Sequence, residues 1–404
     1  MFSRLSTKPR IITGLLFFII AANSFYQVSG QTKIGLFPFE LDGKWGYINK
    51  TGQIIISPQF DEAGFFSDGL AKVKAENKFG FIDEKGKFVI NPKYLEAQRF
   101  SEGIAAVRID NGLWGVIDKS ENMIISPHFY FRSFNLKSEI GQSLIFSEGL
   151  ALVCQDKCGF IDKTGEFVIE QKFEKASPFF NGIAIVTEKQ EDTVYTNNFI
   201  DKSGKYTGAA KSNLVIAESV DELVSRFREW EGTSFNFPLP AYTVSWSTNN
   251  GFVSQSISSK VGFVDAKGNF VINPKYKNAG IFSEELAPVE VNNKWGFINK
   301  KGQMLISPQF TLASWFSEGF APVMIGDNSV PVYVGNVAPK KPEKRPKSAW
   351  GFINKNGKRV IAPQFDRVEV WFTNGLAGVH KGNFFSWINK SGKSLFQWEK
   401  QDKK

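Results

Sequence analysis

Short apolar runs separated by polar turns repeat along most of the chain. The run Trp45-Gly46-Tyr47-Ile48 is followed by Asn49, by a polar segment that ends in Gly52, and by a second apolar run from Gln53 to Ser57. β-Favouring residues on both sides of a short polar segment ending in Gly predict two strands joined by a tight turn. In such a turn the Asn or Asp side chain bonds the backbone two residues on, and Gly supplies the positive φ.

The same block returns about every 34 residues. Seven clear copies carry an x-Gly pair at Trp45-Gly46, Phe79-Gly80, Trp114-Gly115, Cys158-Gly159, Val261-Gly262, Trp295-Gly296 and Trp350-Gly351, and weaker copies lie at Asn198-Phe199 and Ser386-Trp387. Repetition at this period indicates small units stacked into one continuous core. Adjacent residues in the runs are both apolar, so we expect strands covered on both faces. The prediction is an all-β array of about 34-residue β-hairpin repeats, either an open solenoid-like or a propeller-like stack.

Helical tetratricopeptide arrays share this period and are the alternative. Gly or Pro interrupts every copy, and no sustained 3.6-residue apolar pattern occurs, so the helical alternative fails. Pro is also expected to end the second strand of each repeat, at Pro58, Pro92, Pro127, Pro274, Pro308 and Pro363.

Three insertions interrupt the period, at residues 130–145, 207–259 and 326–348. In the second, Val220, Leu223, Val224 and Phe227 are at helical spacing and predict one short helix. We expect this helix to pack on the array, and a partner-binding helix is the alternative. The expected organisation is a signal peptide at 1–30, an N-terminal array at 31–206, an irregular insertion with a helix at 207–259, a C-terminal array at 260–396 and a charged tail at 397–404.

The first thirty residues read as a secretory signal. A basic start is followed by the apolar stretch Ile11 to Ala22 and by small residues at Val28-Ser29-Gly30. The stretch is shorter than the roughly 20 apolar residues of a membrane span, and an uncleaved anchor is the alternative. We therefore expect a secreted or periplasmic protein that is not an integral membrane protein after cleavage. Removal of Arg4, Lys8 and Arg10 changes the formal charge from +9 to +6.

Two blocks of each repeat resemble a known family. The sequences Lys44-Trp45-Gly46-Tyr47-Ile48-Asn49-Lys50-Thr51-Gly52 and Phe66-Ser67-Asp68-Gly69-Leu70-Ala71 resemble the bacterial WG-repeat (KWG-repeat) family, and the likeness covers most of residues 34–206 and 260–393. The resemblance implies a β-rich array of the kind often found in exported or multidomain bacterial proteins. It brings no agreed catalytic residues.

Acidic residues recur at two positions of the repeat but do not indicate catalysis. Asn replaces Asp freely at the first position, which indicates turn formation, in the set Asn49, Asp83, Asp118, Asp162, Asp201, Asp265, Asn299, Asn354 and Asn389. The same interpretation applies to the second set, Asp68, Glu102, Glu148, Glu284 and Glu318. His128 and His380 lie in different copies without a metal-ligand motif. We expect no enzyme activity, metal or cofactor; the alternative is an envelope enzyme with its site in residues 207–259.

Only two cysteines occur. Cys154 and Cys158 flank Gln155-Asp156-Lys157, and a three-residue hairpin loop would bring them face to face. In an oxidising compartment we expect them to form a disulfide.

The charge pattern offers one more candidate site. Lysines on turns serve to solubilise strand ends, whereas the third insertion concentrates Lys340, Lys341, Lys344, Arg345 and Lys347 in one Pro-spaced segment that is either a solvated spacer or a polyanion contact. Export makes nucleic acid an improbable target. The function predicted is a non-catalytic binding or interaction scaffold for a cell-envelope protein or acidic glycan.

Overall fold

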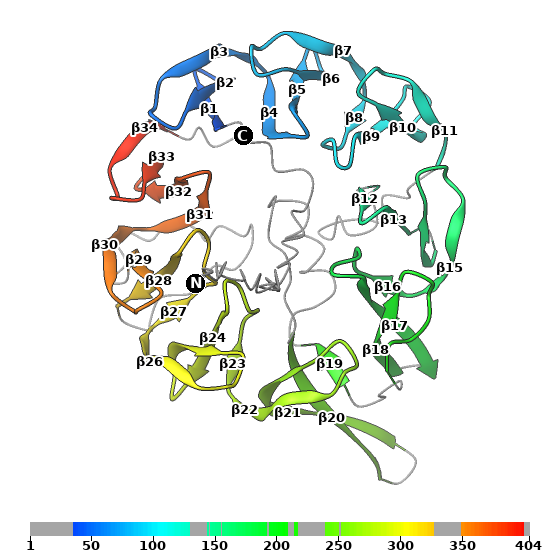
Figure 1. The fold of residues 1–404 in the computed structure, drawn as a ribbon, viewed down its shortest axis with the longest axis vertical. Helices are drawn as coiled ribbons and strands as arrows, with labels where there is room; N and C mark the ends of the chain where they lie inside the picture. Colours follow the sequence, from blue (N-terminus) through cyan, green and yellow to red (C-terminus); the bar gives the residue numbers. More distant parts are fainter. Residues whose placement is uncertain are drawn as a thin grey trace, which may run out of the picture.

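The chain forms a ring of small antiparallel sheets (Figure 1). The computed structural model describes residues 35–129, 144, 146–154, 156–191, 194–208, 214–216, 239–249, 252–326 and 349–399. Within these residues the strands make nine sheets of three or four strands, with neighbours in the sheet also neighbours in the sequence. The strands of the nine sheets, in chain order, are as follows.

The first sheet contains β1 (Leu36–Leu41), β2 (Lys44–Asn49) and β3 (Ile54–Phe60); the second contains β4 (Glu62–Ser67), β5 (Leu70–Ala75), β6 (Lys78–Ile82) and β7 (Phe88–Tyr94); the third contains β8 (Glu96–Ala97), β9 (Ile104–Arg108), β10 (Trp114–Asp118) and β11 (Met123–Phe129). The fourth contains β12 (Phe146–Ser147), β13 (Leu150–Cys154), β14 (Cys158–Ile161) and β15 (Phe167–Phe173); the fifth contains β16 (Lys175–Ala176), β17 (Ile183–Glu191) and β18 (Val194–Asp201); the sixth contains β19 (Leu214–Ile216), β20 (Leu239–Asn249), β21 (Phe252–Val264) and β22 (Phe270–Tyr276). The seventh contains β23 (Asn278–Ala279), β24 (Leu286–Val291), β25 (Lys294–Asn299) and β26 (Met304–Phe310); the eighth contains β27 (Leu312–Ala313), β28 (Phe320–Ile325), β29 (Ala349–Asn354) and β30 (Arg359–Phe365); the ninth contains β31 (Arg367–Thr373), β32 (Leu376–Lys381), β33 (Phe384–Asn389) and β34 (Ser394–Glu399).

The sheets radiate like the blades of a propeller. In Figure 1 strands such as β4 and β31 lie toward the centre and strands such as β7 and β30 lie on the perimeter. Of the two arrangements that the repeats left open, the propeller is therefore the one observed. The segment that leads from the outer strand of one sheet into the next sheet contains the innermost strand of that next sheet.

The core lies between neighbouring sheets, as strands apolar on both faces require. Tyr47 packs against Phe66 and Val73 of the second sheet, whereas the adjacent Ile48 packs with Phe37 and Trp387 toward the ninth. Successive side chains of one strand thus enter two different interfaces. The cluster that contains Ile48, Phe37 and Trp387 joins the first and last sheets and so closes the ring.

The Pro residues of the repeat do not end the outer strand as predicted. Pro58 lies inside β3, where Tyr47 pairs with Ile56 and Trp45 pairs with Phe60. Between these pairs one residue of β2, Gly46, lies opposite three of β3, Ser57 to Gln59. Pro58 occupies the resulting bulge of an edge strand, where its missing N–H breaks no ladder.

This bulge explains the glycine of the Trp-Gly pair. A Cβ added at Gly46 would lie 2.4 Å from the carbonyl oxygen of Ile56, and the equivalent glycines meet the same obstacle. In the ninth sheet Ser386 takes this position, and there it pairs in register with Gln397 without the bulge. Gly is therefore required at this position only where the bulge brings the backbone of the outer strand against the preceding strand.

Residues 207–259 are not simply inserted between two arrays. Their described parts supply β19, β20 and most of β21, which pair with β22 in the sixth sheet. The predicted helix with Val220 to Phe227, the insertion at 130–145 apart from Leu144, and nearly all of the third insertion lie outside the described residues, as does the signal segment. In the part of the chain that the structure describes, no helix is long and apolar enough to cross a membrane.

Candidate functional site

The recurring Asp and Asn residues form turns, as the sequence indicated. Asp162 Oδ1 accepts hydrogen bonds from the backbone N–H of Thr164 at 2.8 Å and of Glu166 at 3.2 Å, and from the Thr164 hydroxyl at 2.6 Å. These donors, the hydroxyl above all, hold the pKa of the Asp162 carboxyl below its usual value. Asn49 accepts equivalent bonds from Thr51 and Gln53. The carboxylates at this position are engaged by the backbone and are not arranged as acid/base pairs.

The second set of acidic residues does more than form turns. Glu102 has a φ of 53° at the turn before β9 and accepts a hydrogen bond from the N–H of Gly149, in the next sheet, at 3.0 Å. Equivalent bonds join Asp68 to Gly103, Glu148 to Gly182, Glu284 to Gly319 and Glu318 to Gly375. We call this contact the clasp, because it ties each of these sheets to the following one.

A lysine and a serine complete each clasp. Lys163 lies 3.1 Å from the Glu102 carboxylate and donates to the Glu102 carbonyl at 3.1 Å. The Ser101 hydroxyl donates to the carbonyl of Phe146 at 2.8 Å. The corresponding lysine–acid contacts are Lys119 with the Asp68 carbonyl, Lys202 with Glu148, Lys355 with Glu284 and Lys390 with Glu318. Sequence reasoning missed this role, although the Ser-acid pair before the second strand of each of these sheets, followed by Gly except at Glu285, was a signal for it.

The seam between the ninth and first sheets has an open pocket at the clasp position. Its volume is about 600 Å³, and its lining includes Gly35, Lys50, Ile55, Glu84 and Asn374. Asn374 stands where the acidic residue stands in the five clasps, with the same left-handed backbone at φ 49°, and Asn181 of the fifth sheet is a second Asn at this position. The pocket thus coincides with an altered clasp.

A second surface feature repeats around the ring. Aliphatic side chains 43–56% exposed occupy one position of the outer strands β3, β7, β11, β15, β22 and β26, at Ile55, Val89, Ile124, Val168, Val271 and Leu305. We call this set the outer aliphatic row. These strands lie on the perimeter of the ring (Figure 1).

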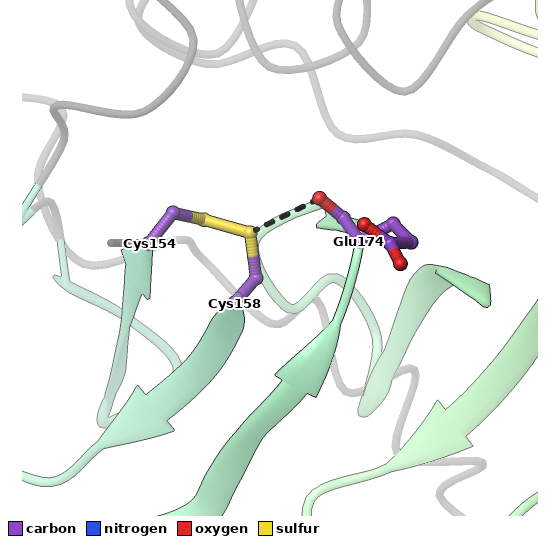
Figure 2. Close-up of a disulfide and its surroundings, with 3 residues drawn as sticks. All are labelled: Cys154, Cys158 and Glu174. Atoms are coloured by element: carbon purple, nitrogen blue, oxygen red, sulfur yellow. Dashed lines mark hydrogen bonds between the residues drawn. A yellow bond between two sulfur atoms is a disulfide. The ribbon is translucent and has the colours of Figure 1, made fainter. Parts of the chain in front are cut away.

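The structure joins Cys154 and Cys158 in a disulfide between β13 and β14 (Figure 2). The two residues are direct cross-strand partners with a Cα–Cα distance of 4.1 Å. The sulfur of Cys158 also lies 3.9 Å from the carbonyl oxygen of Glu174, a contact with the strand connection to the fifth sheet. The basic segment with Lys340, Lys341, Lys344, Arg345 and Lys347 lies outside the described residues.

Among the residues that the structure describes, His380 and the tryptophans do not form a site. His380 pairs with Glu369 of its own sheet, and no group of three metal-ligating side chains occurs among the residues that the structure describes. Trp114 is buried, and Trp295 and Trp350 pack half-buried against the interfaces of the seventh and eighth sheets. Trp114 is therefore a core residue, and Trp295 and Trp350 pack partly into the core.

Comparison with known proteins identifies the repeat and the fold. The family described as WG containing repeat matches residues 45–79, 79–112, 114–131, 159–190, 262–295, 295–328 and 350–383. No protein with a curated description matches the chain.

Solved structures match over most of the chain at low identity. A crystal structure of the eukaryotic initiation factor is similar with a TM-score of 0.56 and 10% identity, covering 90% of this chain and 96% of that one. BamB from Moraxella catarrhalis matches with a TM-score of 0.32 and 10% identity, covering 91% and 97% respectively. The first likeness supports the fold alone.

Proposed function

Because the chain belongs to the family of WG-containing repeat proteins, we propose that it is a non-catalytic binding scaffold of the cell envelope. The outer aliphatic row carries this proposal. The recurring carboxylates are engaged in turns and clasps, whereas the row repeats an apolar side chain on the perimeter without a packing partner that would cover it within the described chain. Contiguous exposed apolar surface is typical of protein-binding sites, and in three of these strands the preceding residue, Ile54, Met123 or Met304, is also an exposed hydrophobic.

Two features support the cell envelope as the proposed location. The first thirty residues have the pattern of a secretory signal. The disulfide between Cys154 and Cys158 suits an oxidising compartment. The partner class that fits the outer aliphatic row is a protein with an apolar surface, and the basic segment around Lys344 offers an additional contact for an acidic glycan.

Two triple variants test the proposal. The first changes Val89, Val271 and Leu305, which lie outside the seam pocket, to Thr; the control changes Asn91, Asn273 and Ser307, exposed residues of the same strands, to Thr. Both keep β-branched residues on the surface, so their melting temperatures should stay close to the parent's. Immobilised parent and control protein should retain the same envelope proteins after cross-linking, and the first variant should lose them. Equal retention by all three proteins would overturn the proposed role of the row.

A further inference from the structure

The pocket at the ring seam differs from the complete clasps by one missing charge. In the five complete clasps a carboxylate receives a backbone N–H of the next sheet and lies beside a lysine of that sheet. At the seam the corresponding residues are Asn374, Gly35 and Lys50, and all three line the pocket. Asn374 has the length of Asp68, which makes a clasp, but it is neutral, so the carboxylate is absent from an otherwise equivalent position.

The groups that would bind this carboxylate have no other partner in the described chain. Within the residues that the structure describes, neither the Lys50 ammonium nor the Gly35 N–H has a hydrogen-bond or ion-pair partner. Lys50 is exposed at the turn after β2, in the position that Lys163 and Lys390 occupy in their clasps. A cation and a backbone donor that converge on one pocket are a suitable receptor for a carboxylate.

The other side of the pocket has the opposite charge. Glu84 follows the turn-opening Asp83, a position where most other turns have the clasp lysine. A carboxylate here accepts hydrogen bonds from hydroxyl or ammonium groups and repels a second anion. The Thr51 hydroxyl lies in the same lining, while Leu36 and Ile55 supply only a small apolar wall. The lining therefore suits a ligand with a single negative charge and neighbouring hydrogen-bond donors.

We propose that the seam pocket binds a small ligand carrying one carboxylate, which takes the place of the glutamate side chain missing from the ninth sheet. The proposal rests on the proposed binding function and names a ligand class for it. The carboxylate comes either from an acidic sugar or from the end of a peptide, and both present donors that Glu84 and Thr51 accept. A pocket of about 600 Å³ is large enough for either source.

Calorimetric titration of the full chain with three probes tests the proposal. The probes are D-glucuronate, D-glucose as the neutral sugar, and N-acetylglycine as the peptide end. Binding of either carboxylate, with D-glucose at least about tenfold weaker, is the expected result. A preference for D-glucuronate over N-acetylglycine assigns the site to an acidic sugar, and the reverse assigns it to a peptide end.

Two variants and a control locate the site. Lys50→Gln should weaken carboxylate binding about tenfold or more. Asn374→Glu should complete a sixth clasp, abolish binding of the probes and raise the melting temperature. The control Lys163→Gln breaks a complete clasp in the third and fourth sheets and should leave the affinity unchanged.

Three outcomes would overturn the inference: no carboxylate binds, D-glucose binds as well as D-glucuronate, or Asn374→Glu binds like the parent. These results are independent of the outer aliphatic row. If retention of envelope proteins persists while carboxylate binding fails, only this inference is lost. If carboxylate binding holds while retention fails, the proposed protein partner is lost.

Discussion

The indole N–H of Trp387 donates a 3.0 Å hydrogen bond to the backbone carbonyl of Pro38 and so joins the last sheet to the first. The Trp387 ring also lies 5.1 Å from that of Phe37 and 6.1 Å from that of Phe65. Gly52 of the first sheet packs so closely in the same seam that an added Cβ would lie 2.6 Å from the carbonyl oxygen of Leu395. Among the described strands, none crosses from one terminal sheet into the other. Within the residues that the structure describes, the ring is therefore held closed there by side-chain packing and this hydrogen bond.

Trp387→Phe should destabilise the protein by about 1–3 kcal/mol, because it leaves the buried Pro38 carbonyl without its donor. Trp398→Phe is the matched control, since it removes an indole from the same cluster without a hydrogen bond to the first sheet among the described contacts. Chemical denaturation of both variants measures the difference. Equal free energies of unfolding for the two would show that the bond contributes nothing to closure.

Gly296→Ala should cost about 1–3 kcal/mol or more, because the new Cβ would lie 2.5 Å from the carbonyl oxygen of Ile306 and 2.8 Å from the nitrogen of Pro308. Both obstacles are backbone atoms that cannot move without disturbing the bulge. Ser386→Ala, at the equivalent position without a bulge, should stay within about 1 kcal/mol of the parent. If the two variants have the same melting temperature, close packing of the outer strand is not the reason for the glycine.

The local chemistry of the repeat was predictable because it depends on neighbours in the sequence. The turn formed by Asp162 and the burial of both faces around Tyr47 follow from residues a few positions apart. The expectation for Pro58 was wrong because Pro ends a regular strand but also suits an edge bulge, and only the pairing with β2 distinguishes the two. Innermost strands such as β8, with two residues, are too short to show an apolar pattern in the sequence.

Contacts between sheets could not be predicted in the same way. A solenoid and a propeller place the same residues on the same strands, so closure depends on contacts such as that between Trp387 and Pro38, which are 349 residues apart. The clasp residues were visible as Ser-acid turns, yet their partners lie in the following sheet. The seam pocket required knowing that Asn374 and Lys50 meet, which only the closed ring establishes.

Glu284→Ala should destabilise the protein by about 1–3 kcal/mol, because it removes a charged acceptor from the Gly319 N–H and leaves Lys355 without its partner. The neighbouring Glu285→Ala is the control: its ion pair with Lys300 is exposed and should contribute less than about 1 kcal/mol. Thermal melts of both variants make the comparison. A loss no larger for Glu284→Ala than for Glu285→Ala would contradict the clasp.

The disulfide should be found in the isolated protein. A thiol assay on the unreduced, denatured chain should detect no free thiol, since Cys154 and Cys158 are its only cysteines. The bond closes a very short loop, so replacing both residues with Ser should cost about 2 kcal/mol or less. Two reactive thiols per chain would show that the pair is reduced in the protein.

Acid should lower the stability of the protein partly by protonating the Asp residues that form the turns. The pKa of Asp118 is held below its usual value chiefly by the Asn122 side chain, that of Asp162 by the Thr164 hydroxyl and that of Asp201 by the Ser203 hydroxyl. A folded-state pKa below the unfolded value of about 3.9 gives stability that is complete above that pH and is lost as the pH falls through the folded value.

Replacing Asp118, Asp162 and Asp201 with Asn tests this pH dependence, because Asn49 makes the same turn with an uncharged side chain. The triple variant should lose less stability than the parent between about pH 5 and pH 2. A control that changes the exposed Glu76, Glu166 and Glu170 to Gln removes the same net charge without touching a turn-opening residue, and its acid curve should follow the parent more closely. Free energies of unfolding in urea at each pH supply the measurement. If the Asn variant and the Gln control respond to acid alike, general charge repulsion accounts for the effect and the turns do not.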